Sequence, residues 1–241
     1  MILITRPKGQ SKELKLKLTA KGFKIFHENF YSFKYYRKTV SYKKTNYYIF
    51  PSIHAVNSLK KNKQIAKFKD AKIFAIGEQV FKVLSKSGCK NIISISQDSK
   101  TLLKTLQSYL KSDDQFIYFC SNIVNEIFFV EADKHKINFK KIRVYKTIAI
   151  KSFTKKLNDS FALNNITGIT FYSKLAVDTF LMLASKYKIL KQVRNMPVYC
   201  ISDRVAKPLI HKQFKSVYVA KEPNERSLIA SINKKHFIAR W

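Results

Sequence analysis

Several kinds of residue and motif are scarce in this sequence of 241 residues. It has three cysteines, Cys89, Cys120 and Cys200, which lie far apart and form no CxxC pair. Neither a disulfide scaffold nor a zinc ribbon is therefore predicted, and reduced cytoplasmic thiols are expected. No apolar run approaches the roughly 20 residues that span a bilayer, and no export signal is visible at the N-terminus. We expect a soluble cytoplasmic protein without a membrane partner.

The common catalytic motifs are absent as well. The sequence contains no GxGxxG and no GxxxxGK[ST], so neither a dinucleotide nor a P-loop site is supported. It has no GxSxG, and its five histidines are scattered without an HExxH motif, so no metal site is expected. We expect an enzyme with this sequence to act mainly by positioning its substrate.

Acidic residues are few, since 15 Asp and Glu stand against 47 Lys and Arg, and the formal net charge is +32. Such a charge suggests a polyanionic partner. Only seven of the 47 cations are Arg, whereas a dedicated nucleic-acid surface usually carries more of this bidentate phosphate ligand. Lys, Asn, Ile, Phe and Tyr share A/T-rich codons, so a biased genome would produce much of this basicity without a binding role.

The apolar residues that are present, 46% of the chain, predict alternating strands and helices. The first unit reads as a strand at 2–4, a helix at 10–20 and a strand at 23–27. A similar unit reads as a strand at 116–120, a helix at 122–135 and a strand at 139–150. Strands that are separated by helices favour a parallel sheet with right-handed crossovers.

Two stretches of the chain also resemble each other. Ser52 and Ser173 each follow an apolar strand and precede Ala-Val at the start of a helix. Three further matches follow in the same order: 73–77 with 198–202, 89–93 with 214–218, and 98–103 with 224–229. The second copy then lacks its last unit, which only residues 2–28 can supply. The repeat is therefore cyclically permuted.

This repeat predicts an α/β fold of two open parallel-sheet lobes that are joined by a two-stranded linker. Lobe 1 is discontinuous and comprises residues 1–30 and 151–241, and lobe 2 comprises residues 36–145. The linker strands, 30–36 and 145–151, are predicted to pair as a short antiparallel ribbon. Open α/β sheets bind ligands at the carboxyl ends of their strands. Ser, Asn and Gly in the turns there either cap helices or present backbone N–H groups to an anion.

These turns resemble those of the uroporphyrinogen-III synthase family. The resemblance rests on Ile-Thr-Arg-Pro at 4–7, two Ser-x-x-Ala-Val turns, Ala-Ile-Gly at 75–77, Val-Tyr-Lys-Thr at 144–147 and Val-Ala-Lys-Glu-Pro at 219–223. It implies two α/β lobes with the active site in the cleft between them. It also implies a cofactor-free, cyclising lyase of heme biosynthesis. That enzyme converts hydroxymethylbilane to uroporphyrinogen III with loss of water and inversion of the last pyrrole ring.

The resemblance also implies roles for individual residues. Tyr145 is the candidate general acid for the departing hydroxyl, and its phenol, with an ordinary pKa of about 10, is protonated at neutral pH. A Tyr that only packs the linker is the alternative. The substrate carries eight carboxylates, and the implied substrate-binding residues are Arg6, Ser52, Gly77, Val80, Ser121, Asn122, Ser173, Lys174 and Ser202. A solvated surface role is the alternative for Lys174, and simple helix capping is the alternative for each Ser.

One departure from the family pattern concerns the turns that usually run Gly-x-x-Thr-Ala. Val80 and Val205 replace the two Thr, which removes a hydroxyl near the cleft in each lobe. We still expect activity, as a monomer acting on a small molecule. Two other classes stay open: a two-lobed anion-binding protein without chemistry, and a single-stranded nucleic-acid-binding protein. The latter would use the aromatic and basic stretch 30–50 as a stacking platform.

Overall fold

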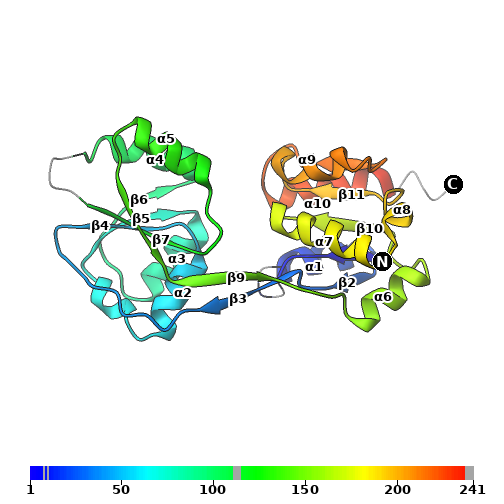
Figure 1. The fold of residues 1–241 in the computed structure, drawn as a ribbon, viewed down its shortest axis with the longest axis horizontal. Helices are drawn as coiled ribbons and strands as arrows, with labels where there is room; N and C mark the ends of the chain where they lie inside the picture. The colour runs from blue at the N-terminus through cyan, green and yellow to red at the C-terminus, as the bar shows by residue number, and fades with distance from the viewer. Residues whose placement is uncertain (8, 10, 111–114, 237–241) are drawn as a thin grey trace. The chain divides into compact units, whose positions relative to one another are not determined.

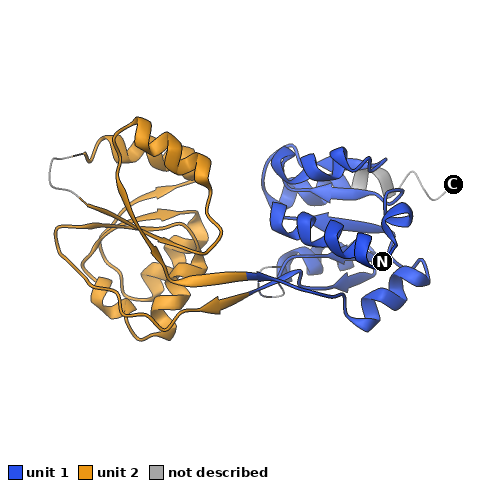
Figure 2. Cartoon of the chain, in the orientation of Figure 1, with its two compact units in different colours: residues 1–32, 148–241 blue, residues 33–147 orange. Residues whose placement is uncertain are grey.

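The computed structural model describes residues 1–7, 9, 11–110 and 115–236, with side chains up to residue 232. The chain divides into two compact units (Figure 2). Unit 1 combines the two chain ends, Met1–Ser32 and Ile148–Trp241, and unit 2 is Phe33–Thr147. The fold is α/β with two parallel sheets and a two-stranded antiparallel ribbon, which confirms the predicted fold class. The division into lobes 1–30 with 151–241 and 36–145 stays a prediction.

Unit 2 is built on a five-stranded parallel sheet in the order β6-β5-β4-β7-β8. Helices lie on both faces of this sheet (Figure 1). The strands are β4 (Tyr47–Phe50), β5 (Lys72–Ile76), β6 (Ile92–Ser96), β7 (Phe116–Cys120) and β8 (Phe139–Arg143). The helices are α2 (Ile53–Lys61), the short 3₁₀ helix η2 (Ile65–Phe68), α3 (Glu78–Lys86), α4 (Ser99–Gln107) and α5 (Glu126–Lys134).

The central strand β4 explains why this sheet forms. All four of its residues are buried, and their side chains alternate between two apolar clusters. Tyr48 and Phe50 pack towards α2, η2 and α3, while Tyr47 and Ile49 pack towards α4 and α5. A strand that is buried on both faces reads as a continuous apolar run, as expected for a parallel sheet that is covered by helices on both sides.

Unit 1 repeats this plan with a permuted chain. Its sheet has the order β12-β11-β10-β1-β2, and all neighbouring strands are parallel. The strands are β1 (Ile2–Ile4), β2 (Ile25–His27), β10 (Gly168–Phe171), β11 (Val198–Cys200) and β12 (Val217–Val219). The helices are α1 (Lys12–Ala20), α6 (Lys155–Ala162), α7 (Lys174–Lys186), α8 (Leu190–Val193), α9 (Asp203–His211) and α10 (Glu225–His236).

The two sheets correspond strand by strand once the permutation is allowed for. Counted from the strand that precedes Ser52 or Ser173, each sheet has the strand order 3-2-1-4-5. In unit 1 the fourth and fifth strands are β1 and β2, at the N-terminus of the chain. The N-terminal segment therefore completes the second copy, as the sequence repeat predicts.

Strands β3 (Tyr31–Tyr35) and β9 (Tyr145–Ala149) form the ribbon, in which the chain passes between the units. The N–H of Tyr36 donates to the carbonyl of Val144 at one end of the ribbon (3.0 Å). The N–H of Ile150 donates to the carbonyl of Phe30 at the other end (3.1 Å). The two strands are thus related by an approximate two-fold axis.

The structure corrects two boundaries that were predicted from the sequence. Residues 139–150 are not one strand, because Val144 separates β8 from β9; its N–H bonds to Cys120 in the sheet and its carbonyl bonds to Tyr36 in the ribbon. Asn122 does not begin a helix, since α5 begins only at Glu126. The Asn122 side chain instead accepts a hydrogen bond from the N–H of Thr147 on β9 (2.8 Å), which keeps 121–125 as a loop.

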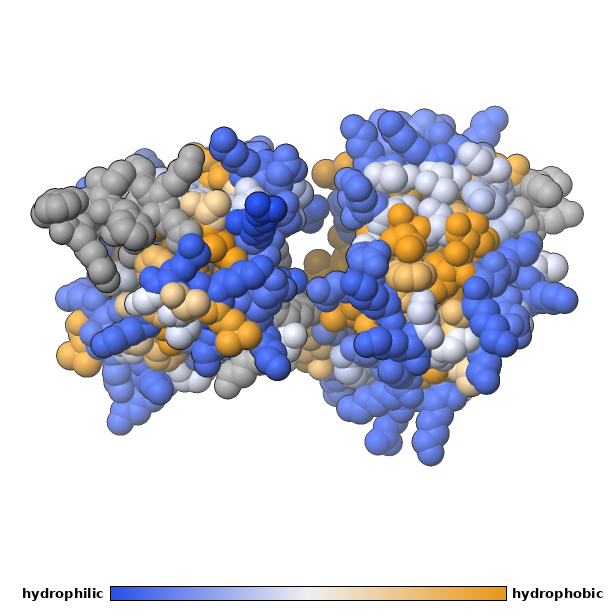
Figure 3. Space-filling view, turned by 180° about the vertical axis from the view of Figure 1, so that it is seen from behind, coloured by the Kyte–Doolittle hydropathy of each residue, from blue (hydrophilic) through white to orange (hydrophobic). Residues whose placement is uncertain are grey.

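The surface and the aromatic stretch 30–50 show whether this basic chain presents a platform for a nucleic acid. On the face shown in Figure 3, hydrophilic side chains cover much of each unit, with apolar patches among them. Of the nine aromatic side chains of this stretch, five are buried, namely Phe30, Tyr31, Tyr47, Tyr48 and Phe50, and the other four are half-buried. The five buried side chains are core residues of the two units, so they are not available to stack on the bases of a nucleic acid.

Candidate active site

The carboxyl ends of the parallel strands carry the predicted site residues. In each sheet the order in which the strands are connected changes direction between the first and fourth strands, which are β4 and β7 in unit 2 and β10 and β1 in unit 1. Ligands of open α/β sheets bind at this switch point. Ser52 and Ser121 follow the two strands in unit 2, and Ser173 and Thr5 follow them in unit 1.

Ser52 is the N-cap of α2, and its backbone is extended (φ −156°, ψ 146°). Its hydroxyl oxygen accepts a hydrogen bond from the N–H of His54 (3.2 Å). On the other side of the switch point, the Ser121 hydroxyl donates to the carbonyl of Ile123 and accepts from its N–H (2.6 and 3.0 Å). Both hydroxyls are held by backbone contacts, so their positions are fixed before a ligand arrives.

Tyr145 lies near these two serines. Its side chain is buried, at 8% exposure. Burial raises the pKa of the Tyr145 phenol, and the nearby Ser52 and Ser121 hydroxyls act in the opposite direction. The phenol is therefore protonated at neutral pH, and the serines favour its ionised form once a proton has left. Of the predicted residues, the structure thus brings Tyr145, Ser52 and Ser121 together.

His54 was not singled out from the sequence but packs against this cluster. Its ring stacks on Phe33, with centroids 3.5 Å apart, and lies 5.8 Å from the Tyr145 ring. Nδ1 of His54 lies 3.1 Å from the Tyr35 hydroxyl. Burial lowers the pKa of His54 to about 4, so the imidazole is neutral at neutral pH. The spacing of histidines along the chain carries no sign of this contact, since Phe33 and Tyr145 come from the two ribbon strands.

Gly77, Val80 and Ser202 lie in the first turns of α3 and α9. Gly77 is the N-cap of α3 with φ +89°, a conformation that favours glycine. Ser202 is the N-cap of α9 and makes no side-chain capping hydrogen bond. The Val80 side chain is buried in the same cluster as Tyr145, and Val205 is buried in unit 1. The two valines at the family's Thr positions are therefore well packed as apolar residues.

In unit 1, Ser173 caps α7 by accepting a hydrogen bond from the N–H of Ala176 (3.2 Å). Lys174 is exposed and pairs with Asp178 one turn along the helix (2.6 Å), which fits the solvated alternative. Arg6 forms an ion pair with Glu225 (3.5 Å) and lies over the Tyr172 ring at 4.6 Å. Arg6 is therefore held in place at the carboxyl end of β1.

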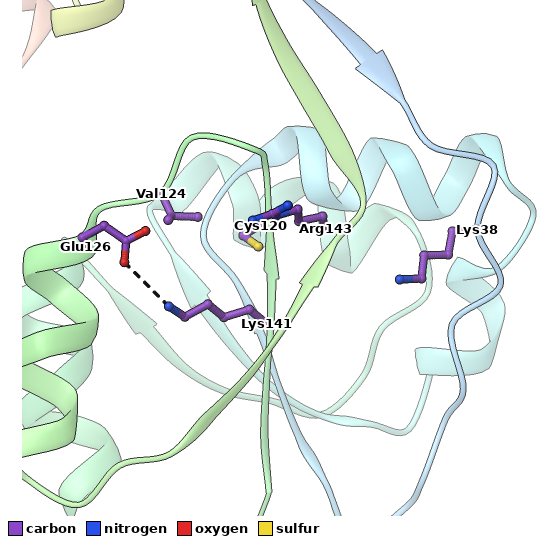
Figure 4. Close-up of a pocket in the computed structure, with 6 residues that line it drawn as sticks. All are labelled: Lys38, Cys120, Val124, Glu126, Lys141 and Arg143. Atoms are coloured by element: carbon purple, nitrogen blue, oxygen red, sulfur yellow. Dashed lines mark ion pairs between the residues drawn. The ribbon is translucent and has the colours of Figure 1, made fainter.

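Unit 2 also contains a basic cavity of about 300 Å³ at the carboxyl ends of β7 and β8 (Figure 4). Cys120 and Arg143, the last residues of these strands, are paired in the sheet. Lys141 pairs with Glu126 at 3.8 Å. Within the part of the chain that the structure describes, Lys38 and Arg143 form no ion pair. Two cations thus remain available to a bound anion, and residues far apart in the sequence supply them.

Residues 1–7, 9, 11–110 and 115–236 contain no group of three His, Cys, Asp or Glu side chains that could hold a metal ion. Among these same residues, no helix is both long and apolar enough to cross a membrane.

Comparison with known proteins gives a consistent result. The family model described as uroporphyrinogen-III synthase HemD matches residues 2–230. No curated protein sequence matches the chain. Uroporphyrinogen-III synthetase from Helicobacter pylori 26695 is similar in structure, with a TM-score of 0.65 at 16% identity over 97% of this chain and 98% of that one. A mutant uroporphyrinogen III synthase from Thermus thermophilus has a TM-score of 0.57 at 12% identity over 97% of each chain. These two likenesses support the same fold.

Proposed function

The chain belongs to the uroporphyrinogen-III synthase family, and from this premise we propose that Tyr145 is the general acid of its reaction. The activity is the cyclisation of hydroxymethylbilane to uroporphyrinogen III in tetrapyrrole synthesis. Family membership favours this lyase over the nucleic-acid-binding and non-catalytic alternatives. The burial of five aromatic side chains in the stretch 30–50 argues in the same direction.

The observation that carries the proposal is the burial of the Tyr145 side chain against α2, near Ser52 and Ser121 at the switch point of unit 2. A general acid must hold its proton until the substrate arrives and must tolerate the charge that follows. Burial meets the first need by raising the pKa of the Tyr145 phenol. The two serine hydroxyls meet the second, because hydrogen bonds to a phenolate stabilise it.

The proposed sequence of steps begins with a proton transfer. The Tyr145 hydroxyl protonates the hydroxymethyl oxygen. The C–O bond then breaks, water departs, and the hydroxymethyl-bearing pyrrole becomes an electrophilic azafulvene. The substituted carbon of the last pyrrole attacks the methylene carbon of the azafulvene to give a spiro intermediate. This intermediate reopens and recloses with the last pyrrole ring inverted. The pyrrole carbon that forms the final bond loses its proton, and this proton restores the Tyr145 phenol. Holding the bilane folded supplies much of the barrier reduction.

The carboxylates of the substrate require anion-binding groups. We assign this role to the helix N-termini at Ser52, Gly77, Ser173 and Ser202, to the loop residues Ser121 and Asn122, and to Arg6. Each helix N-terminus contributes about 0.3–1 kcal/mol towards an anion at an exposed end. Lys38 and Arg143 bind a further carboxylate in the basic cavity, where an arginine fork suits a carboxylate geometrically. Lys174 contributes least, since Asp178 already neutralises it.

Val80 and Val205 bear on whether the reaction needs the family's Thr hydroxyls. Both side chains are buried, and a valine has nearly the shape of a threonine. Packing around the turn is therefore kept while two possible hydrogen bonds to the substrate are lost. We propose that backbone N–H groups and the serine hydroxyls bind the substrate sufficiently without them.

The assembly and location of the enzyme are also part of the proposal. We propose a monomer that acts in the cytoplasm on a small-molecule substrate, without a nucleic-acid partner and without a cofactor. The three cysteines are unpaired and buried, as expected of a protein made in a reducing compartment.

Purified protein given enzymatically generated hydroxymethylbilane tests the proposal, with the type III and type I isomers separated by chromatography. The wild-type chain is expected to give the type III isomer, whereas the free bilane closes without inversion. Tyr145→Phe should lower kcat at least about 10²-fold, the typical contribution of a general acid. Tyr109→Phe is the matched control, because Tyr109 packs in the other apolar cluster of unit 2. A Tyr145→Phe variant with wild-type kcat would refute the assignment of the acid.

A further inference from the structure

Tyr31 in unit 1 occupies the position that corresponds to Tyr145 in unit 2. Each of the two residues is the first of its ribbon strand, and each follows the fifth strand of its own sheet. Each comes directly after the residue whose carbonyl accepts the terminal ribbon hydrogen bond, Phe30 in one case and Val144 in the other. The approximate two-fold axis of the ribbon therefore exchanges the two tyrosines. The sequence repeat alone does not reveal this, since unit 1 has two more residues between its fifth strand and its tyrosine.

The surroundings of the two phenols correspond as well. Both tyrosines are 8% exposed. The Tyr31 side chain lies near Ser173, the N-cap of α7, as the Tyr145 side chain lies near Ser52, the N-cap of α2, and each serine hydroxyl lowers the pKa of its tyrosine. Ser52 and Ser173 are the matched serines of the internal repeat. Each unit thus carries a buried phenol against a capping hydroxyl at its own switch point.

The two sites differ on the side of the fourth strand. In unit 2 the residues after β7 are Ser121 and Asn122, and the Ser121 hydroxyl reaches Tyr145. In unit 1 the residues after β1 are Thr5 and Arg6. The Thr5 hydroxyl is buried and donates to the carbonyl of Thr170 (2.7 Å), while the Arg6 guanidinium acts electrostatically on Tyr31. A fixed cation thus replaces a neutral hydroxyl beside the phenol.

We propose that Tyr31 is a substrate-binding residue, whose phenol, together with the Ser173 hydroxyl, donates a hydrogen bond to a carboxylate of the bilane. This role rests on the proposed function. Arg6 and the N-terminus of the 13-residue helix α7 both favour an anion at this place. Glu225 and Tyr172 hold the guanidinium, so Arg6 adds a positive field without having to reorganise. The two equivalent tyrosines therefore have different roles: Tyr145 donates the proton, and Tyr31 binds a carboxylate of the substrate.

Steady-state kinetics with hydroxymethylbilane distinguish these roles. Tyr31→Phe is expected to raise KM about tenfold, the order expected when a hydrogen bond to a charged group is lost, with kcat changed less than twofold. Tyr145→Phe should show the opposite split, a lower kcat. Tyr187→Phe is the matched control, because Tyr187 lies at the opposite end of α7 from Ser173 and stacks on Phe153. Thermal unfolding of each variant checks its fold.

Ser173→Asp provides a second test that does not depend on the fold of Tyr31→Phe. Asp is a good N-cap, so α7 is kept, but its charge repels a carboxylate. We expect KM to rise more than tenfold. An unchanged KM in either variant, or a Tyr31→Phe variant that loses kcat instead, overturns the role proposed for Tyr31. Failure of the proposed function looks different, because the wild-type chain would then yield only the type I isomer.

Discussion

His54 makes the stability of unit 2 depend on pH in a way that can be predicted. Its ring stacks on Phe33 and lies 5.8 Å from the Tyr145 ring, and burial lowers its pKa from 6.5 to about 4. The unfolded chain therefore binds a proton between these pH values that the folded chain does not. The contribution of His54 to stability is complete above pH 6.5, and it is lost as the pH falls from 6.5 towards 4.

The size of this effect follows from the shift. A shift from 6.5 to about 4 corresponds to an upper bound of about 3.4 kcal/mol, at 1.36 kcal/mol for each unit. The ring is only partly buried, so solvent screening reduces this value. We expect the free energy of unfolding to fall by about 1–2 kcal/mol between pH 7 and pH 4.5 because of His54 alone.

Urea denaturation of the wild type and of His54→Asn at pH 7 and pH 4.5 isolates this contribution. Other titrating groups act equally in both proteins, so they cancel when the two pH-dependent differences are compared. The variant should lose about 1–2 kcal/mol less than the wild type on acidification. An equal loss in both proteins would show that the imidazole is not desolvated by Phe33 and Tyr145, and would refute the reasoning.

Two other substitutions test parts of the fold and the cavity. Gly77→Ala should lower the free energy of unfolding by about 1–3 kcal/mol in urea denaturation, because a φ of +89° strains a residue that has a Cβ. Among the described residues the added Cβ meets no atom within 4 Å, so the backbone strain acts alone. Gly9→Ala, whose Cβ is equally free and whose φ lies outside the left-handed region, should change it by less than about 0.5 kcal/mol. Arg143→Gln should raise KM for hydroxymethylbilane several-fold with kcat unchanged, if the basic cavity binds a carboxylate. Lys104→Gln, an exposed cation in the last turn of α4, is the control with the same loss of charge and should leave KM at the wild-type value.

The order of the elements was largely predictable because each of its signals is local. The apolar runs of β4 and β7 and the Ser-x-x-Ala-Val turns depend only on neighbouring residues. The repeat then fixed which strands correspond, and so where the N-terminal strand-helix-strand segment belongs. The boundaries at Asn122 and Val144 were missed because long-range hydrogen bonds decide them. Thr147 takes the Asn122 side chain, and Cys120 and Tyr36 divide the backbone groups of Val144.

The site was predictable to the extent that it lies on those turns. Ser52 and Ser121 were identified, because a serine after a buried strand is a local pattern. His54 and Arg143 were not identified, because their importance comes from what lies across the fold. His54 matters through Phe33 on the ribbon, and Arg143 matters because β8 ends beside Cys120 and the segment around Lys38 passes nearby. Contacts between residues that are far apart in the chain leave no local pattern, so a single sequence does not predict them.

The net charge of +32 says little by itself about how this protein binds its substrate. Most of the cations are exposed lysines spread over both units, and several are neutralised by an acidic residue one turn away, as Lys174 is by Asp178. The cations that matter at the two switch points are few, and two of them are arginines, Arg6 and Arg143. An exposed lysine adds little beyond solubility, because water screens it and its long side chain must be ordered before it can bind. The Arg6 guanidinium, which Glu225 and Tyr172 already hold, needs no such ordering. The specificity of this chain for a polycarboxylate is therefore expected to depend on a few positioned groups beside two equivalent tyrosines, and only weakly on its overall charge.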